Sequence, residues 1–235
     1  MLKIENLTKK YGDKVAVNNL SLEINKGEIY GFIGHNGAGK TTTLKCVVGI
    51  SDFDAGKITL NGVSVKESPV EYKKKIAYIP DNPDLYEYMT GIKFLNFISD
   101  IFGIDTNTRK EKIDKLSEQF EIKNDLGKPI STYSHGMKQK LAIIAAWIHS
   151  PEFIIMDEPF VGLDPKAAYI LKGMMREACD NGCAIFFSTH VLEVAEKLCD
   201  KIAIIKKGDL IKSGTMEEVK GDDSLEDVFL EMEEN

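Results

Sequence analysis

The sequence predicts an α/β fold in which a helical segment interrupts a core of parallel strands. Five short apolar runs have the length of buried strands, and helical stretches separate most of them, which is the pattern of a parallel sheet. These runs cover residues 29–33, 76–80, 153–156, 184–187 and 202–205. Residues 91–149 lack strong strand signals and look helical. Within them Leu141, Ile144, Ala145 and Ile148 share one helix face.

The first part of the chain predicts a second, antiparallel sheet. Residues 2–33 read as short strands, and Leu20, Leu22 and Ile24 alternate with polar residues as in a half-buried sheet. Asn61-Gly62 lies between two apolar runs and predicts a tight hairpin turn.

A glycine-rich loop follows the run at 29–33 and precedes a predicted helix over residues 41–50. It matches the pattern G-x-x-x-x-G-K-[ST] in full, with the sequence Gly34-His35-Asn36-Gly37-Ala38-Gly39-Lys40-Thr41. Its glycines let backbone N–H groups turn toward phosphate oxygens at a helix N-terminus. We expect Lys40 to reach the β- and γ-phosphates and the Thr41 hydroxyl to hold Mg²⁺, with Thr42 beside them in the nucleotide site. A chance match in a glycine-rich turn is the alternative, and the strand–loop–helix context argues against it.

Two acidic residues end the apolar run at 153–156. Asp157 would lie at the carboxyl edge of the sheet, where α/β proteins bind ligands, and would hold Mg²⁺ directly or through water. Glu158 is placed to orient and polarise an attacking water. An ordinary acidic strand end is the alternative for the pair alone. Together with the loop, the pair predicts hydrolysis of a nucleoside triphosphate.

Composition narrows the class of protein. The chain has 235 residues, 43% of them hydrophobic, enough for one core with a smaller subdomain. Residues 1–5 alternate like a strand and do not resemble a signal peptide, and no apolar run approaches a membrane span of about 20 residues. The four cysteines lack metal-type spacing and read as reduced thiols.

Charge is concentrated at the end of the chain. The net charge is −7, and residues 217–235 contain nine acidic residues and one lysine, so the body is near neutral. The basic triplet Lys73-Lys74-Lys75 reads as the end of a solvated helix. This distribution predicts no nucleic-acid partner.

The acidic end predicts a short helix. Ser224 and Asp227 have the spacing of a capping box. The apolar stripe of this helix would be Leu225, Val228, Phe229 and Met232. We expect the stripe to pack on this domain or on a second copy, and an acidic polar face disfavours a membrane surface.

The segment Tyr133-Ser134-His135-Gly136-Met137-Lys138-Gln139 resembles the signature Leu-Ser-Gly-Gly-Gln of ABC transporter ATP-binding subunits. The resemblance covers essentially the whole chain. It implies a P-loop NTPase (RecA-like) core with an antiparallel β subdomain and an inserted helical subdomain, acting on ATP with Mg²⁺. The implied ATPase domain is 1–220, with its core at 1–80 and 151–220 and the helical subdomain at 81–150, followed by the acidic helix at 221–235.

The resemblance also implies roles for single residues. Tyr11 would stack on adenine, Asp164 would communicate across a dimer, and His190 would contact the γ-phosphate. Ser134 and Gly136 would contact ATP held by a second subunit. The catalytic set is then Lys40, Glu158 and His190. Of the other histidines, His35, His135 and His149 read as loop or surface positions.

Four positions depart from the family pattern. Asp81 stands where the family usually has Gln, and we keep it as a candidate contact to the nucleotide and to Mg²⁺. The signature has Tyr133 for Leu, His135 for Gly and Met137 for Gln, while the Ser and the second Gly are retained. An active site with altered signature contacts is therefore expected.

The resemblance implies a subunit that powers transport, with export favoured over import. Its partners would be a second ATP-binding subunit, as homodimer or heterodimer, and an integral membrane subunit, with the chain bound at the cytoplasmic face of the membrane. Two alternatives remain at this point. One is a module that binds ATP mainly for regulation. The other is a non-transport ATPase of DNA repair or ribosomes, which would usually carry a coiled-coil insert, zinc modules or a second ATPase domain. The sequence predicts no particular cargo.

Overall fold

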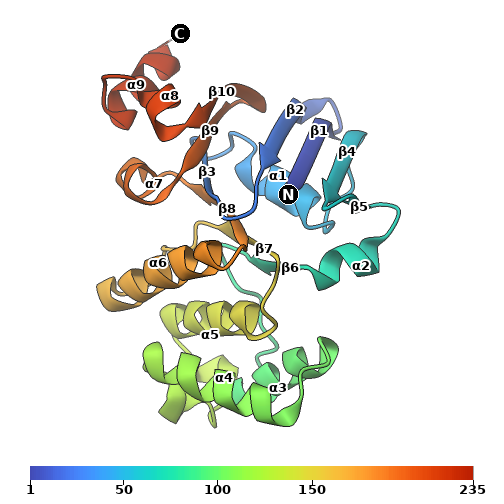
Figure 1. Cartoon of the computed structure of the whole chain (residues 1–235), viewed down its shortest axis with the longest axis vertical. Helices are drawn as coiled ribbons and strands as arrows, with labels where there is room; N and C mark the ends of the chain where they lie inside the picture. The colour runs from blue at the N-terminus through green and yellow to red at the C-terminus, as the bar shows by residue number, and fades with distance from the viewer. Residues whose placement is uncertain (235) are drawn as a thin grey trace.

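Two β-sheets, with helices packed between and around them, form the chain (Figure 1). The computed structural model describes the backbone of residues 1–234 and the side chains of residues 1–232. One sheet has four strands in the order β2-β1-β4-β5, and the other has six in the order β10-β9-β3-β8-β7-β6.

The four-stranded sheet is the predicted antiparallel one. It contains β1 (Leu2–Tyr11), β2 (Lys14–Ile24), β4 (Ala55–Leu60) and β5 (Val63–Ser64). Alternate residues at the end of β2 are buried, which confirms the predicted half-buried face. β1 and β2 are not short, however, because they pair over almost their whole lengths and have 10 and 11 residues. The predicted turn at Asn61-Gly62 joins β4 to β5, and both residues have positive φ, as a tight hairpin requires.

The six-stranded sheet is parallel except at one edge. It contains β3 (Ile29–Ile33), β6 (Ile76–Ile79), β7 (Phe153–Asp157), β8 (Ala184–Thr189), β9 (Lys201–Lys206) and β10 (Asp209–Thr215). Each of the five predicted apolar runs forms one of its parallel strands. β10 adds an antiparallel edge strand that the sequence did not predict, because it is mostly exposed and carries polar residues. The order places β3 between β8 and β9, so the carboxyl ends of β3, β7 and β8 meet at one edge.

The helices fall into two groups (Figure 1). α3 (Gly91–Ile101), α4 (Thr106–Gln119) and α5 (His135–Ile148), with the 3₁₀ turns Lys123–Asp125 and Ile130–Thr132, form the predicted helical segment at the bottom of the view. The others lie near the two sheets: α1 (Lys40–Val47), α2 (Pro69–Lys74), α6 (Pro165–Asp180), α7 (Leu192–Leu198), α8 (Met216–Lys220) and α9 (Leu225–Glu234). The lysine triplet ends α2, as predicted.

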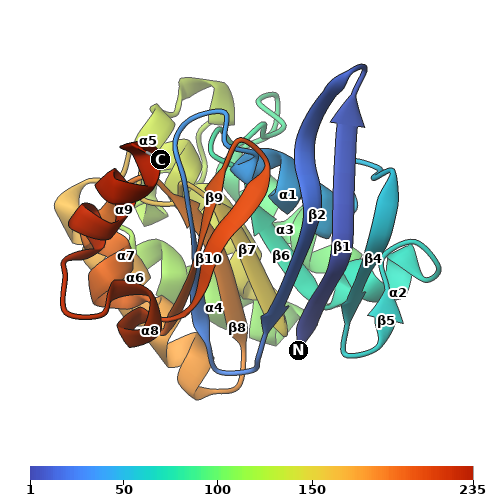
Figure 2. The same ribbon diagram turned by 90° about the horizontal axis from the view of Figure 1, so that it is seen from above.

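Two apolar clusters hold these layers together, and Figure 2 shows the antiparallel sheet beside the parallel one. One cluster joins α1 to both sheets and includes Leu2, Phe32 and Leu44. The other joins the parallel sheet to the helical segment through residues such as Ile144 and Met156. The helical segment and the strands around β3 therefore share one continuous core.

The apolar stripe of α9 packs on its own chain. Leu225, Val228 and Phe229 are buried in the larger cluster. Ser224 caps the helix, since its hydroxyl accepts a hydrogen bond from the Asp227 N–H at 3.1 Å. The expected capping box is confirmed. We expected the stripe to pack on this domain or on a second copy, and in the structure it packs on this domain.

One histidine differs from its prediction. His149 ends α5 half-buried, its ring stacked on Phe102 at 3.7 Å, so it is not a plain surface residue. Burial lowers the pKa of its imidazole, and the Nε2 atom lies 3.1 Å from the Ile76 carbonyl oxygen. Among the described helices there is no stretch that is both long and apolar enough to span a bilayer.

Candidate active site

The glycine-rich loop joins the end of β3 to the start of α1. Gly37 and Gly39 have φ values of 82° and 112°, a region that L side chains disfavour. Gly34 lies so close to β9 that a Cβ there would be 2.5 Å from the Ile205 carbonyl oxygen. The sequence therefore needs glycine at these positions, and the resulting backbone leaves the N-terminus of α1 open to an anion.

A cavity of about 590 Å³ opens over this loop. Its size is typical of a small-molecule site. It brings together eleven of the residues expected from the sequence: Tyr11, His35, Asn36, Gly37, Gly39, Lys40, Thr41, Thr42, Asp81, Asp157 and Glu158. Gly34 and Ala38 belong to the loop but do not line the cavity, because Gly34 packs on β9 and the Ala38 side chain is buried.

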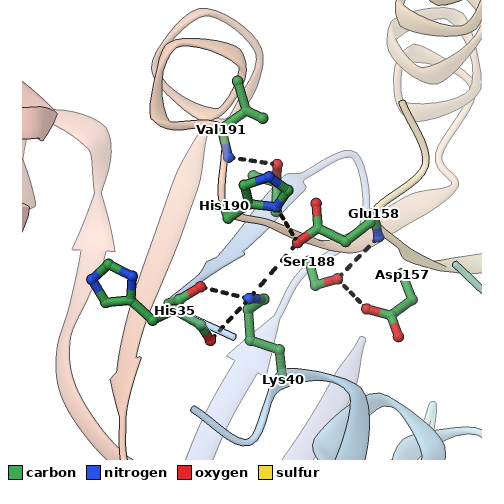
Figure 3. Close-up of polar contacts among 9 residues, drawn as sticks. His35, Lys40, Asp157, Glu158, Ser188, His190 and Val191 are labelled. Carbon is green, nitrogen blue, oxygen red and sulfur yellow. Dashed lines mark hydrogen bonds and ion pairs between the residues drawn. The ribbon is translucent and has the colours of Figure 1, made fainter. Parts of the chain in front are cut away.

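Lys40 is the buried cation of the site, with 6% of its surface exposed. Its Nζ atom donates to the carbonyl oxygens of Gly34 and His35, at 2.5 Å and 3.3 Å, and lies 3.7 Å from Glu158 Oε1 (Figure 3). Burial lowers the pKa of Lys40, and the nearby carboxylates Glu158 and Asp157 oppose that shift. The ammonium is thus held by the loop itself, within reach of any anion that enters the cavity.

Ser188 holds the two acids that end β7. Asp157 pairs with Ser188 in the register of β7 and β8, and the Ser188 hydroxyl donates to Asp157 Oδ1. The Ser188 hydroxyl oxygen also accepts a hydrogen bond from the Glu158 N–H at 3.1 Å (Figure 3). Glu158 has a φ of 48°, which is uncommon for a residue with a side chain. Backbone strain of this kind is concentrated at functional sites.

His190 reaches the same carboxylate from the end of β8. Its Nδ1 atom lies 2.9 Å from Glu158 Oε1, and the ring is half exposed. Val191 donates its N–H to Thr189 Oγ1 at 3.0 Å, which fixes the turn after β8. Lys40, Glu158 and His190, expected as the catalytic set, therefore form one connected group.

The rim of the cavity includes residues that the sequence did not single out. Lys14 and Lys207 line it beside Tyr11. No sequence motif includes these two lysines. Lys14 follows the turn after β1 and Lys207 lies in the turn after β9, and the fold brings these two turns to the same side of the cavity. Tyr11 and Asp81 are both exposed at the rim.

Ser134, Gly136 and Asp164 do not line this cavity. Ser134 caps α5 by accepting from the Met137 N–H at 3.3 Å. Asp164 caps α6 by accepting from the Ala167 N–H at 2.9 Å, and its carboxylate lies 2.7 Å from Lys140 Nζ. The hydrogen bond from Lys140 lowers the pKa of Asp164.

The loop before α6 packs tightly on the start of α5. A Cβ at Gly136 would lie 2.7 Å from the Gly162 carbonyl oxygen, and one at Gly162 would lie 2.4 Å from the His135 ring. The chain thus fixes the segment 134–136 to the loop that follows Glu158. Sequence reasoning missed this contact and the Lys140–Asp164 pair.

The residues present fit Mg²⁺ bound together with phosphate. Thr41 and Asp157 both line the cavity, and Asp81 lies at its rim. No group of three or more His, Cys, Asp or Glu side chains is arranged to hold a metal within the described part of the chain. Proteins commonly bind Mg²⁺ through one or two carboxylates plus the phosphates of a substrate.

A second cavity of about 600 Å³ lies elsewhere, between the helical segment and the far end of α6. Trp147, Met174 and Cys183 line it, and none of the expected site residues does. The expected site residues therefore gather at the cavity over the loop and not at this second cavity, although the two are similar in size.

The fold and the cavity define a P-loop nucleotide-binding domain. A family model described as "ABC transporter" matches residues 17–161. The chain is 35% identical over 237 residues to the ABC-type transporter ATP-binding protein EcsA of Bacillus subtilis, covering 99% of this chain and 96% of that protein. The chain belongs to the ABC transporter family of ATP-binding proteins, and it is an ATPase as their ATP-binding domains are.

Further comparisons agree. The chain is 35% identical over 215 residues to the linearmycin resistance ATP-binding protein LnrL of Bacillus subtilis, covering 92% of this chain and 69% of that protein. A solved ATP-binding subunit of an ABC transporter matches with a TM-score of 0.95 and 32% identity, covering 99% of each chain. A dimeric ATP-binding cassette bound to ADP and Pi matches with a TM-score of 0.83, covering 92% of this chain and 99% of that one; at 21% identity this likeness shows the fold alone.

Proposed function

We propose that this ATPase powers the export of a substrate through a separately encoded membrane subunit, using Mg²⁺ and the residues gathered over the glycine-rich loop. The observation that carries the catalytic part is the connected group of Lys40, Glu158 and His190: Lys40 and Glu158 line one cavity, and His190, which does not line it, contacts the Glu158 carboxylate. A P-loop lysine, oxygen ligands for Mg²⁺ and a residue that orients the attacking water are the parts that recur in enzymes that transfer a phosphoryl group to water.

Each residue has a role that follows from its place. Lys40 would exchange its loop carbonyls for phosphate oxygens, and Tyr11 at the rim would stack on the base. Thr41 and Asp157 would hold Mg²⁺, with Asp81 as a further candidate. When bound, Mg²⁺ supplies positive charge to the β- and γ-phosphates. Glu158 would take a proton from the attacking water, while His190 holds the carboxylate in place.

We propose that Ser134, Gly136 and Asp164 act on a second copy or a close relative of this chain. They lie outside the cavity over the loop, so they cannot complete that site within one chain. The N-terminus of α5, capped by Ser134, is suited to an anion presented by a partner. Two subunits arranged head to tail would then share two ATP sites, as homodimer or heterodimer.

The surface beside Asp81 is the proposed contact with the membrane subunit. A small cavity of about 270 Å³ lies between the end of β6 and helices α3 and α5, lined by apolar residues such as Pro83, Leu85 and Phe94. Tyr88, 80% exposed, and Ile101, 58% exposed, add apolar surface on the same helical segment. Clustered exposed apolar residues mark interaction sites.

We propose a division into a core (1–80 and 151–220), a helical subdomain (81–150) and an acidic helical segment (221–235), of which residue 235 lies outside the described residues. The helical subdomain would transmit the opening and closing of the ATP sites, and the chain would work at the cytoplasmic face of the membrane. Export is favoured because a relative, LnrL, is named as a resistance protein.

Replacement of Glu158 by Gln tests the proposed chemistry. The amide keeps the shape but cannot accept the proton, so we expect ATP turnover with Mg²⁺ to fall about 10²- to 10⁴-fold. ATP binding should persist, and light scattering should show an ATP-stabilised dimer. Glu177→Gln, an exposed position on α6 outside this cavity, is the matched control and should leave turnover unchanged. Unchanged turnover in Glu158→Gln would refute the assigned role.

A further inference from the structure

The acidic helix α9 contacts the phosphate-binding loop. The ring centroids of His35 and Phe229 are 4.8 Å apart, at an interplanar angle of 53°. On β9, the strand next to β3, Lys206 donates from Nζ to the Met232 carbonyl oxygen at 2.8 Å. The helix therefore contacts both the loop and β9, the strand on which the loop packs.

Phe229 is held firmly on its own side of this contact. It is 8% exposed, and Leu225 and Val228 on the same helix face are 0% and 7% exposed. The capping box at Ser224 and Asp227 fixes the start of the helix. The Phe229 ring is thus packed in the larger apolar cluster.

His35 connects the Phe229 ring to the inside of the phosphate-binding loop. Figure 3 shows its ring pointing away from Lys40, while its backbone carbonyl faces Lys40. That carbonyl accepts from Lys40 Nζ at 3.3 Å and from the Ala38 N–H at 3.1 Å. Because the ring and this carbonyl belong to one residue, a contact that restrains the ring also limits how far the backbone of His35 can move.

The rest of the loop needs support of this kind. Gly37 has no atom within 4 Å of the position where a Cβ would lie, so nothing restrains it from that side. The inner side is braced, because the Gly208 N–H donates to the Ala38 carbonyl at 2.8 Å and Gly34 packs on Ile205. On the outer side, the aromatic contact with Phe229 restrains His35.

We propose that Phe229 is a positioning residue for ATP binding: through His35, α9 holds the phosphate-binding loop in the conformation that receives phosphate. This inference rests on the proposed role of the loop residues. The affinity for ATP then depends on a helix that itself lies outside the cavity.

The test separates the aromatic contact from helix packing. Phe229→Leu keeps an apolar side chain but removes the ring, whereas Phe229→Tyr keeps the ring. We expect Phe229→Leu to raise the Kd and KM for ATP about two- to tenfold, the value of one aromatic pair. The kcat should change less than about twofold, because the loop contacts phosphate in both ground state and transition state. Phe229→Tyr should restore wild-type affinity.

Val228→Ala is the control for stability. It truncates a buried neighbour on the same helix, so it should lower Tm while leaving the Kd for ATP unchanged. If Val228→Ala weakens ATP as much as Phe229→Leu does, general loosening of α9 explains the effect and the inference is overturned.

A double-mutant cycle with His35→Ala completes the test. His35→Ala keeps the backbone and removes only the ring, so the two losses in affinity should not add. Additive losses, or an unchanged Kd in Phe229→Leu, would overturn the inference. The proposed function would still stand in that case, provided that the wild-type chain binds and hydrolyses ATP. A wild-type chain that binds no ATP would overturn both.

Discussion

At the scale of single residues, the site combines side chains that motifs identify with others that only the fold reveals. Lys40 and Glu158 stand in short patterns whose chemistry is local, so the sequence predicted them. Ser188 carries no such pattern, yet it bonds both acids at the end of β7. Its position at the end of the neighbouring strand was the available signal, because parallel strands bring their carboxyl ends to one edge.

Replacement of Ser188 by Ala should affect stability and catalysis together. It leaves the buried Asp157 carboxylate and the Glu158 N–H each without one partner, so we expect a loss of about 1–3 kcal/mol in the free energy of unfolding. Turnover should fall about 10- to 100-fold, since residues that hold catalytic groups have effects of that size. Urea denaturation and steady-state ATPase rates measure the two effects.

Ser99→Ala is the matched control for this prediction. Ser99 is also fully buried, but its hydroxyl only donates to the Leu95 carbonyl one helical turn earlier, at 2.8 Å. Turnover should stay at the wild-type level. A Ser188→Ala variant that behaves like Ser99→Ala would show that Ser188 does not organise the two acids.

At the scale of elements, the glycine before Asp164 is required by its backbone and packing, whereas the glycine after it, inside α6, is not. Gly162 has a φ of 78° and touches the His135 ring, whereas Gly173 lies inside α6 with open space where a Cβ would be. The sequence indicates neither difference, because a glycine looks the same in both places. Local sequence patterns predicted the strands, the loop and the caps. They could not predict which elements pack closely together, because those contacts join residues that are far apart in the sequence.

The two glycines should therefore respond oppositely to alanine. Gly173→Ala should raise the free energy of unfolding by about 0.5–1 kcal/mol, through a less flexible unfolded chain. Gly162→Ala should lower it by about 1–3 kcal/mol and reduce ATP turnover, because strain and the His135 ring both oppose the new methyl group. Denaturation curves compare the variants, and equal effects would contradict the packing described for the loop before α6.

At the scale of the whole molecule, the proposed pairing gives each chain two half-sites on different parts of its surface. The group around Lys40 lies over the parallel sheet, and the cap of α5 lies outside that cavity. The resemblance implies this division, which stays a prediction. The inserted helical segment was also expected, because the strand pattern disappears from the sequence between 91 and 149.

Mixing two inactive variants tests the proposed pairing. Lys40→Ala removes the phosphate contact of one half-site. Ser134→Asp keeps a good N-cap but places a negative charge where a partner's phosphate would bind. Each variant alone should be nearly inactive. An equal mixture should regain roughly a quarter of wild-type turnover, because half of the dimers then contain one intact site. No recovery on mixing, with dimers detected, would contradict the shared site.

The strand order also sets a delay during synthesis. β3 leads into the phosphate-binding loop, and its lateral partners are β8 and β9. A ribosome that has completed residue 33 must still reach residue 184 before the first of these partners exists. At ordinary elongation rates that takes roughly 8 to 30 s. The antiparallel pair β1–β2 can form much sooner, from neighbouring residues. The nascent chain therefore carries β3, which is fully apolar apart from one glycine, without its lateral partners until β8 has been synthesised, and this strand must be kept from aggregating during that time.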